Sequence, residues 1–182
     1  MYEVELKFRL ENAESVVARL ASLGAVRSSP QEQTDQYFNH PSRDFGQTDE
    51  ALRIRSAGNR HFVTYKGPIV DTQTKTRREI EIPLEGDAAA DQFADILRAL
   101  GFRSVRAVRK RRQPFQITWQ ARQFEIAVDD VADLGRFVEI ETQADEAGRA
   151  AAIQAILAFA SQFELGSPER RSYLCLLLSE NC

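Results

Sequence analysis

The stretch Tyr-Glu-Val-Glu-Leu-Lys-Phe-Arg at residues 2–9 alternates charged and apolar side chains without a break. Successive side chains of a β-strand point to opposite faces, so Glu3, Glu5 and Lys7 would share one face of a strand. Two further stretches repeat the pair of glutamates around one aliphatic residue: Glu79-Ile80-Glu81 and Glu139-Ile140-Glu141. Carboxylates and cations gathered on strand faces indicate a charged interior that binds a metal ion and an anion.

Composition limits the class of protein. The chain has 182 residues, of which 43% are hydrophobic and 28% charged, and a net charge of −3. These values fit one domain over residues 1–182 with a sizeable core, and the acidic balance argues against general nucleic-acid binding. The apolar run 174–178 is too short to cross a membrane, and the N-terminus begins in a charged strand rather than a signal peptide.

The two cysteines, Cys175 and Cys182, are expected to be reduced thiols and not a disulfide framework or a zinc site. Together with the absence of a signal peptide, they predict a cytoplasmic protein.

Hydrophobic periodicity predicts an α+β fold. The strands are mostly joined by short turns, which favours an antiparallel sheet or barrel over a parallel one. Helices would cover its apolar outer face, and the charged residues would point inward. We expect strands at 2–10, 33–38, 51–56, 61–66, 77–84, 103–111, 114–119, 123–131 and 136–142, helices at 13–23, 88–100 and 145–163, a polar loop at 42–50 and a tail helix that begins at Pro168.

Acids and bases are about equally frequent on the predicted inward faces. A mixture of this kind suits a polyphosphate that is bound together with its divalent metal, because carboxylates hold the metal while Arg and Lys hold phosphate oxygens. The alternative for any one strand is a solvated face with cross-strand ion pairs. Three Glu-x-Glu pairs, together with Arg53-x-Arg55 and Lys110-x-Arg112, make that alternative weaker for the chain as a whole.

The residues 2–9 resemble the Glu-x-Glu-x-Lys signature of the CYTH superfamily, the triphosphate tunnel metalloenzymes. Further stretches resemble the other family motifs in order: Leu52-Arg53-Ile54-Arg55, Lys66-Gly67-Pro68, Arg78-Glu79-Ile80-Glu81, Lys110-x-Arg112, Val128-Asp129 and Leu134 to Glu141. Arg171-Ser172-Tyr173 is similar to a motif near the C-terminus of class IV adenylate cyclases. The resemblance covers essentially the whole chain and implies an eight-stranded antiparallel β-barrel, a tunnel with a charged interior and helices packed outside.

The resemblance also implies roles for individual residues. The metal-binding candidates are Glu3, Glu5, Glu139 and Glu141. The candidates for triphosphate binding are Lys7, Arg53, Arg55, Lys66, Arg77, Lys110 and Arg112; the choice between Arg77 and Arg78 depends on register. Asp129 is a candidate metal ligand or general base and, with Lys110 and Arg112, forms the catalytic group. Glu79 and Glu81 suit either acidic role, and Arg171, Ser172 and Tyr173 are further candidates for the site.

Three functions are compatible with such a tunnel. The first is a class IV adenylate cyclase that converts ATP to cyclic AMP and pyrophosphate with Mg²⁺ or Mn²⁺. The second is a triphosphatase that acts on inorganic triphosphate, thiamine triphosphate or a nucleotide at the same site. The third is a non-catalytic polyphosphate-binding module, which the carboxylates disfavour. The family's cyclases are often dimeric, so a homodimer is a further expectation, with neither nucleic acid nor membrane as a partner.

Overall fold

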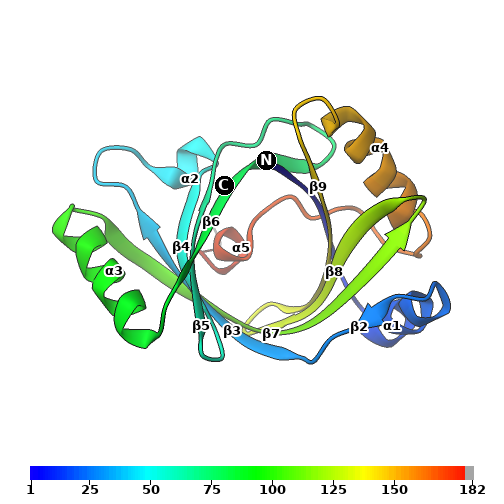
Figure 1. Ribbon diagram of the computed structural model, residues 1–182, viewed down its shortest axis with the longest axis horizontal. Coiled ribbons are helices and arrows are strands. Elements are labelled where there is room, and N and C mark those ends of the chain that lie inside the picture. Colours follow the sequence, from blue (N-terminus) through cyan, green and yellow to red (C-terminus); the bar gives the residue numbers. More distant parts are fainter. Residues whose placement is uncertain (179–182) are drawn as a thin grey trace.

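Strands arranged in a closed ring dominate the computed structural model, which describes residues 1–178 (Figure 1). The strands are β1 (Tyr2–Arg9), β2 (Val26–Arg27), β3 (Gln31–Asn39), β4 (Ala51–Ala57), β5 (Arg60–Lys66), β6 (Lys75–Leu84), β7 (Arg103–Trp119), β8 (Arg122–Val131) and β9 (Gly135–Ala144). The helices are α1 (Ala13–Ser22), α2 (Phe45–Thr48), α3 (Asp87–Ala99), α4 (Arg149–Ala160) and α5 (Tyr173–Leu178).

Hydrogen bonding closes the sheet. The strands follow the order β7-β3-β4-β5-β6-β1-β9-β8, and β8 pairs again with β7, so eight antiparallel strands form a barrel. The short strand β2 is an addition that pairs with β7 at Val26 and Arg27. The predicted α+β fold with an eight-stranded antiparallel barrel is therefore confirmed, although β2 was not predicted.

Strand β7 corrects one prediction, because the two strands expected at 103–111 and 114–119 are a single strand of 17 residues. Its first part pairs with β3 and its second part with β8, so one long strand joins the two ends of the ring. Pro114 lies within it and cannot donate a backbone hydrogen bond, but its carbonyl oxygen accepts one from the backbone of Ser28 at 3.1 Å.

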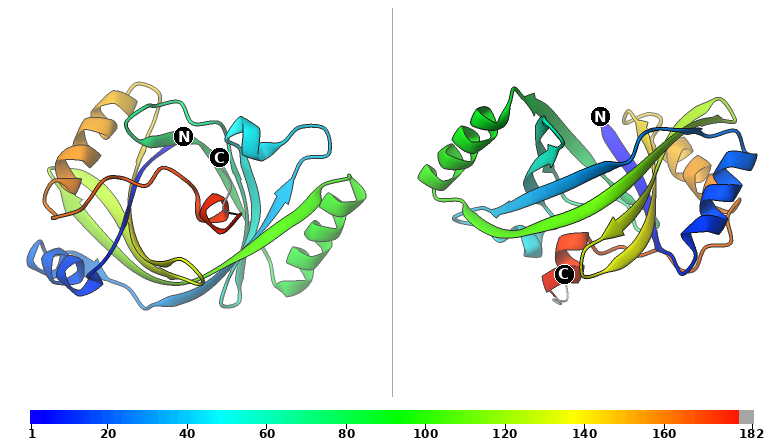
Figure 2. Two further views of the ribbon diagram at one scale, coloured as in Figure 1. Left: turned by 180° about the vertical axis from the view of Figure 1, so that it is seen from behind. Right: turned by 90° about the horizontal axis from the view of Figure 1, so that it is seen from below.

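Apolar side chains on the outer face of the barrel pack under helices α1, α3 and α4 (Figures 1 and 2). Val4 and Ile140 are fully buried there, against Leu20 of α1 and Ile156 of α4. These residues alternate with the glutamates of β1 and β9, as the pattern predicts. The third such residue, Ile80 on β6, is 44% exposed, so the helices do not cover the whole apolar outer face.

Helix α3 is tied to the β4–β5 hairpin by a polar chain of three residues. Ser56 Oγ lies 2.9 Å from His61 Nδ1, and His61 Nε2 lies 2.6 Å from Asp87 Oδ1. Asp87 is the first residue of α3. None of the three lines a cavity identified in the described structure, so this Ser-His-Asp group anchors the helix.

Helix α5 corrects the expectation that all helices pack outside. It lies across one end of the barrel (Figures 1 and 2). Its Tyr173 packs on inward-facing Val108, Val131 and Phe137 from the strands. The end of the barrel next to α5 is therefore closed by an apolar layer.

The segment before α5 is also not helical, contrary to the predicted start at Pro168. It runs along the barrel instead: the backbone of Glu169 donates to the Lys7 carbonyl at 2.7 Å, and Arg170 binds the Asp71 carbonyl at 3.1 Å. Ser172 Oγ then accepts a hydrogen bond from the backbone of Cys175 and begins the helix.

Three smaller predictions also differ from the structure. The polar loop 42–50 contains α2, which Asp44 caps through its side chain. The helix expected at 145–163 is shorter, because it begins at Arg149. Cys175 is disulfide-bonded, so the expected reduced thiol is wrong for this residue; Cys182 lies outside the described residues.

Among the described residues, no helix combines the length and apolar character needed to cross a bilayer.

Candidate active site

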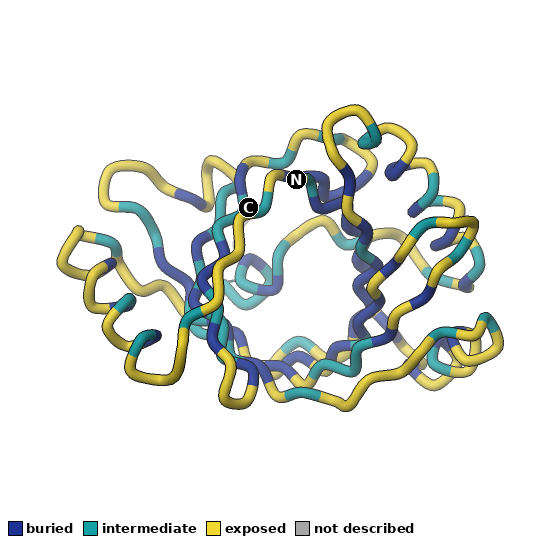
Figure 3. Tube along the Cα trace, in the orientation of Figure 1, coloured by how far each residue is buried: buried dark blue, intermediate teal, exposed yellow. Residues whose placement is uncertain are grey.

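A cavity of about 1110 Å³ runs through the barrel and receives side chains from all eight barrel strands. Buried residues concentrate on β1 and β9, whereas β6 and β7 carry many exposed positions (Figure 3). Most residues that the sequence singled out line this cavity: Glu3, Glu5, Lys7, Arg53, Arg55, Lys66, Arg77, Glu79, Glu81, Lys110, Arg112, Glu139, Glu141, Ser172 and Tyr173.

Three carboxylates form the acidic centre of the cavity. Ligand atoms of Glu3, Glu5 and Glu141 all lie within 4.8 Å of one another. Glu5 and Glu141 are directly opposite each other on β1 and β9, and Glu125 on β8 is in turn opposite Glu141. Like charges directly opposite each other destabilise a sheet, so this arrangement favours a bound cation.

Glu141 shows the consequence of that crowding. Among the described residues, no hydrogen bond or ion pair to its side chain is present, whereas Glu3 binds Lys66 and Glu5 binds Lys75. Burial, with the nearby carboxylates of Glu3 and Glu139, raises the pKa of Glu141 to about 8. Oxygen ligands of this kind suit Mg²⁺ or Mn²⁺, so the donor set fits the predicted cofactor.

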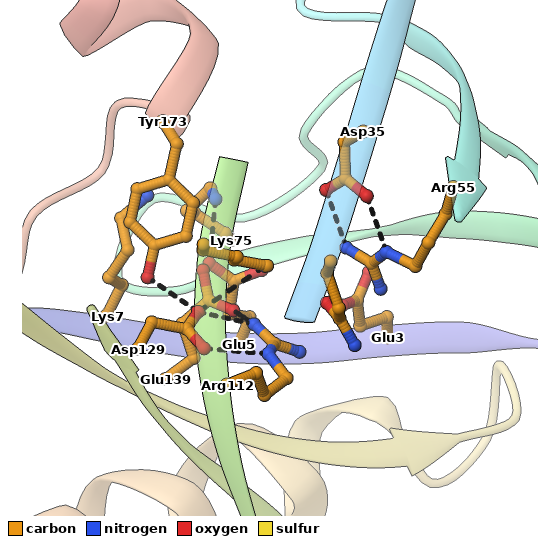
Figure 4. A network of polar contacts seen from close by, with 12 residues as sticks. Glu3, Glu5, Lys7, Asp35, Arg55, Lys75, Arg112, Asp129, Glu139 and Tyr173 are labelled. Atoms are coloured by element: carbon orange, nitrogen blue, oxygen red, sulfur yellow. Dashed lines mark hydrogen bonds and ion pairs between the residues drawn. The ribbon is translucent and has the colours of Figure 1, made fainter. Parts of the chain in front are cut away.

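Glu139 does not join this cluster, although the sequence grouped it with the other three. Its carboxylate forms a short ion pair with Arg112, which also holds Asp129 at 2.6 and 2.8 Å (Figure 4). Burial alone would raise the pKa of Glu139, but the charges of Arg112 and Lys110 hold it well below its ordinary value. Its position therefore suits the orientation of Arg112 better than metal binding.

Asp129 is fully buried beneath Arg112 and is not among the residues that line the cavity. Its oxygens accept hydrogen bonds from Arg112 and, at 3.0 Å, from the Tyr173 hydroxyl (Figure 4). Burial opposes ionisation, yet Arg112 and Lys110 lower the pKa of this carboxyl. A general base needs a pKa near the working pH, so Asp129 suits a positioning role.

Two arginines on β4 share one buried acid that the sequence analysis missed. Asp35 on β3 is 1% exposed, binds Arg55 in a bidentate pair at 2.7 and 2.8 Å, and binds Arg53 at 3.2 Å (Figure 4). Arg53 Nε is buried and has no partner among the described residues. Asp35 therefore fixes the two guanidiniums, and Arg53 keeps a donor for an anionic oxygen.

A second missed residue is Lys75, which lies two residues before the strand predicted at 77–84. It begins β6 and binds Glu5 at 2.7 Å. Lys66 bridges two acids, with Glu3 at 2.5 Å and Glu79 at 3.0 Å. Lys66 and Lys75 thus pair with acids of the Glu-x-Glu pairs on β1 and β6, which limits the net charge of the interior.

The closed end of the cavity carries two more lysines. Lys7 is 1% exposed, donates to the Arg171 carbonyl, and lies 4.3 Å from the centre of the Tyr173 ring; Lys110 lies 5.1 Å from the same ring. Burial, together with Lys75, lowers the pKa of Lys7 to about 7. Burial, together with Arg112, lowers the pKa of Lys110 to about 8.

The lysines have one property in common. The chain has 24 lysines and arginines, but only four of them are lysine, and all four line this cavity: Lys7, Lys66, Lys75 and Lys110.

The remaining candidate residues differ in whether their side chains reach the cavity. Arg77 is 7% exposed and lines the cavity, whereas Arg78 is exposed, which settles the register. Glu81 lines the cavity and accepts a hydrogen bond from Thr64 at 2.8 Å. The Arg171 side chain is exposed, pairs with Glu169 at 2.6 Å and does not reach the cavity, so only its backbone carbonyl contributes.

The fold and this site together identify a class of protein. Residues 1–173 match the CYTH domain family, and the chain belongs to that family.

Its relatives carry related names. A Methanocaldococcus jannaschii protein provisionally named an adenylate cyclase is 41% identical over 141 residues, which are 78% of this chain and 77% of that protein. The adenylate cyclase CyaB of Aeromonas hydrophila is 29% identical over 149 residues, 80% of this chain and 71% of that protein.

Solved structures share the fold. The Pyrococcus horikoshii protein PH1819 has a TM-score of 0.85 at 35% identity and covers 97% of this chain and 98% of its own. A Hippeastrum protein provisionally named an adenylyl cyclase, with a dominant triphosphatase activity, has a TM-score of 0.64 at 16% identity and covers 97% and 95%. At that identity the likeness shows the fold alone.

Proposed function

We propose that this protein is a divalent-metal-dependent adenylate cyclase that converts ATP to cyclic AMP and pyrophosphate inside the barrel. The observation that carries the proposal is the meeting of three carboxylates and four ammonium groups in one cavity. The names of the relatives support cyclisation among the reactions of a bound triphosphate. In this proposal Glu3, Glu5 and Glu141 would hold Mg²⁺ or Mn²⁺, which would supply positive charge against the phosphate oxygens and favour ionisation of the attacking hydroxyl.

The chain's own residues would bind and orient the substrate. Lys7 of β1 and Lys110 and Arg112 of β7 line the same cavity as Arg53 and Arg55 of β4. Their charges would hold the triphosphate and offset the charge that develops on the departing pyrophosphate. Arg112 and Arg55 are each held by a bidentate carboxylate, so the donors are positioned before the substrate arrives.

Cyclisation forms a bond between the ribose 3′ oxygen and the α-phosphorus and breaks the bond from that phosphorus to the bridging oxygen of pyrophosphate. The 3′ hydroxyl loses a proton in this step. Glu79 is a suitable acceptor among the carboxylates of the cavity. Burial and its hydrogen bond with Glu3 raise the pKa of Glu79 to about 7, the range in which a general base works best at neutral pH.

Product analysis tests the proposal directly. Purified protein would be incubated with ATP and Mg²⁺ or Mn²⁺, and the products separated by chromatography. We expect cyclic AMP and pyrophosphate in equal amounts. Phosphate or ADP without cyclic AMP would replace the cyclase by a triphosphatase, and inorganic triphosphate and thiamine triphosphate would be the next substrates to test.

Replacing Lys7 with methionine should weaken triphosphate binding by about tenfold or more, because one charge-assisted hydrogen bond contributes roughly 1.5–3 kcal/mol. Methionine fills similar space, so the barrel should remain folded. Calorimetric titration with inorganic tripolyphosphate in the presence of Mg²⁺ measures the change. Arg9→Met is the matched control, since Arg9 is on the same strand but exposed and outside the cavity. Equal affinities in both variants would place the anion elsewhere.

A further inference from the structure

The barrel contains a second cavity of about 370 Å³ that continues the first. The two share five lining residues: Arg55 and Arg112, which the proposed function assigns to the triphosphate, and Glu81, Glu125 and Glu141. The volume falls in the range of roughly 300–1,000 Å³ that is typical of small-molecule sites. A group bound here would therefore be directly connected to an anion held between these two arginines.

The lining of the second cavity differs in chemistry from the first. Apart from the residues shared with the first cavity, its described lining includes no lysine or carboxylate and one arginine, Arg60. It adds three glutamines, Gln31, Gln33 and Gln116, and the ring of Phe62. Amide groups and an aromatic ring suit an uncharged, flat, polar group and not another phosphate. This end of the tunnel is therefore suited to the organic part of a substrate.

The side chain of Gln33 gives a second reason, independent of the lining, to expect a ligand in this cavity. The residue is 7% exposed, and its Oε1 is one of two buried side-chain polar atoms that have no hydrogen-bond partner in residues 1–178. Its Nε2 donates weakly to Gln31 Oε1 at 3.5 Å, which leaves Oε1 as the free atom. A buried acceptor without a partner costs free energy, so its persistence indicates a ligand that supplies a donor.

The position of Gln33 relates it to the arginine pair. Gln33 and Asp35 share the inward face of β3 and are two residues apart, about 6.6 Å along the strand. Asp35 holds Arg55, so Gln33 lies one step beyond the anion-binding arginines, on the side of the second cavity. A phosphate oxygen is an acceptor and cannot satisfy Gln33 Oε1; an amino or hydroxyl group can.

We infer that the second cavity binds the nucleoside part of a nucleoside triphosphate and that Gln33 accepts a hydrogen bond from it. This inference rests on the proposed triphosphate site and adds the determinant that would distinguish a nucleotide from inorganic tripolyphosphate. The donor is an N–H or O–H group, either the exocyclic amine of the base or a ribose hydroxyl. The Phe62 ring lines the same cavity and offers an apolar wall.

The test is calorimetric titration of the full chain at 4 °C with Mg²⁺, with ligand integrity checked by chromatography after each run. For Gln33→Met we expect ATP affinity to fall about three- to tenfold, the size expected for the loss of one neutral hydrogen bond. Tripolyphosphate affinity should stay within twofold. The melting temperature should be unchanged or higher, because the substitution removes an unpartnered acceptor. Gln36→Met is the matched control: it is on the same strand, and Gln36 lines neither cavity.

Titrations of the wild-type protein with two kinds of ATP analogue identify the group that donates the hydrogen bond to Gln33. If purine riboside triphosphate binds more weakly than ATP, the donor is the amine of the base. If 2′- or 3′-deoxy-ATP binds more weakly than ATP, the donor is a ribose hydroxyl. The inference is overturned if Gln33→Met weakens ATP and tripolyphosphate equally, or if the wild type binds ATP no more tightly than tripolyphosphate. If the wild type binds neither, the proposed triphosphate site fails as well. Gln33→Ala provides the same comparison if methionine prevents folding.

Discussion

Replacing Glu141 with glutamine should abolish metal-dependent turnover while the metal-free barrel stays at least as stable as the wild type. Glu141 lies opposite Glu5 and Glu125 and has no cationic side-chain partner in residues 1–178. Glutamine has the same shape without the charge, so it removes repulsion and also removes a metal ligand. Glu5 is a poorer choice, because its loss would leave Lys75 buried without its partner.

The expected loss is at least about 100-fold in kcat. That corresponds to about 2.7 kcal/mol, less than the several kcal/mol that a bound metal contributes to stabilising charge in a transition state. The measurement is the initial rate against Mg²⁺ and Mn²⁺ concentration, with the metal-induced rise in melting temperature as a second readout. Glu32→Gln, an exposed change that affects only a 3.9 Å contact with Arg111, should alter neither. A Glu141→Gln variant with normal metal dependence would remove Glu141 from the metal site.

The same variant should change how stability depends on pH. The folded pKa of Glu141, about 8, is higher than its ordinary value of 4.5. Between these values the folded state binds the proton more tightly than the unfolded state, so this group lowers the free energy of unfolding as the pH rises. Urea denaturation of the metal-free proteins should therefore show an advantage of the variant that grows from pH 5 to pH 8. An advantage that shrinks with rising pH would contradict the assigned pKa direction.

Replacing Asp35 with asparagine should give the largest loss of stability among changes to the cavity wall. It removes the only charge that offsets Arg53 and Arg55 at short range in the described structure. Loss of one partner from a buried ion pair costs about 3–5 kcal/mol. For a chain of this size each kcal/mol lowers the melting temperature by roughly 2–4 °C, so we expect a decrease of roughly 6–20 °C.

A bound triphosphate should restore part of that stability, because its negative charge can replace the lost carboxylate. Thermal denaturation with and without tripolyphosphate and Mg²⁺ should show a larger ligand-induced rise in the Asp35→Asn variant than in the wild type. Asp130→Asn is the control: Asp130 is exposed, its nearest cation is Arg136 at 3.9 Å, and the change should stay within about 0.5 kcal/mol. Equal stability of the two variants would show that Asp35 does not balance the arginines.

The alternation of residues 2–9 was sufficient to predict which side of the barrel wall each side chain occupies, because a strand has a period of two. It could not predict cross-strand neighbours. Glu139 and Glu141 share a face, yet Glu139 is opposite Lys7 and Glu141 is opposite Glu5. One step along the strand therefore separates an arginine-bound acid from a member of the acidic cluster, and only the register reveals it.

The missed residues had weak local signals. Asp35 is the only acid on its face of β3, beside Gln33 and Tyr37, so it did not resemble the repeated pairs, and its partners are 18 and 20 residues away. Lys75 stands where a polar loop changes into a strand, the kind of boundary that is hardest to locate. The position of α5 inside one end of the barrel depends on packing against β7, β8 and β9, which no local pattern contains.

The distribution of lysines has a practical consequence for chemical labelling. All four lysine side chains of this chain line the tunnel. An acylating reagent used at low concentration would therefore act as a reporter of tunnel occupancy, slowed by whatever fills it. Coupling the protein to a surface or a dye through its lysines would modify the cavity itself, and attachment that preserves the tunnel must use other chemistry.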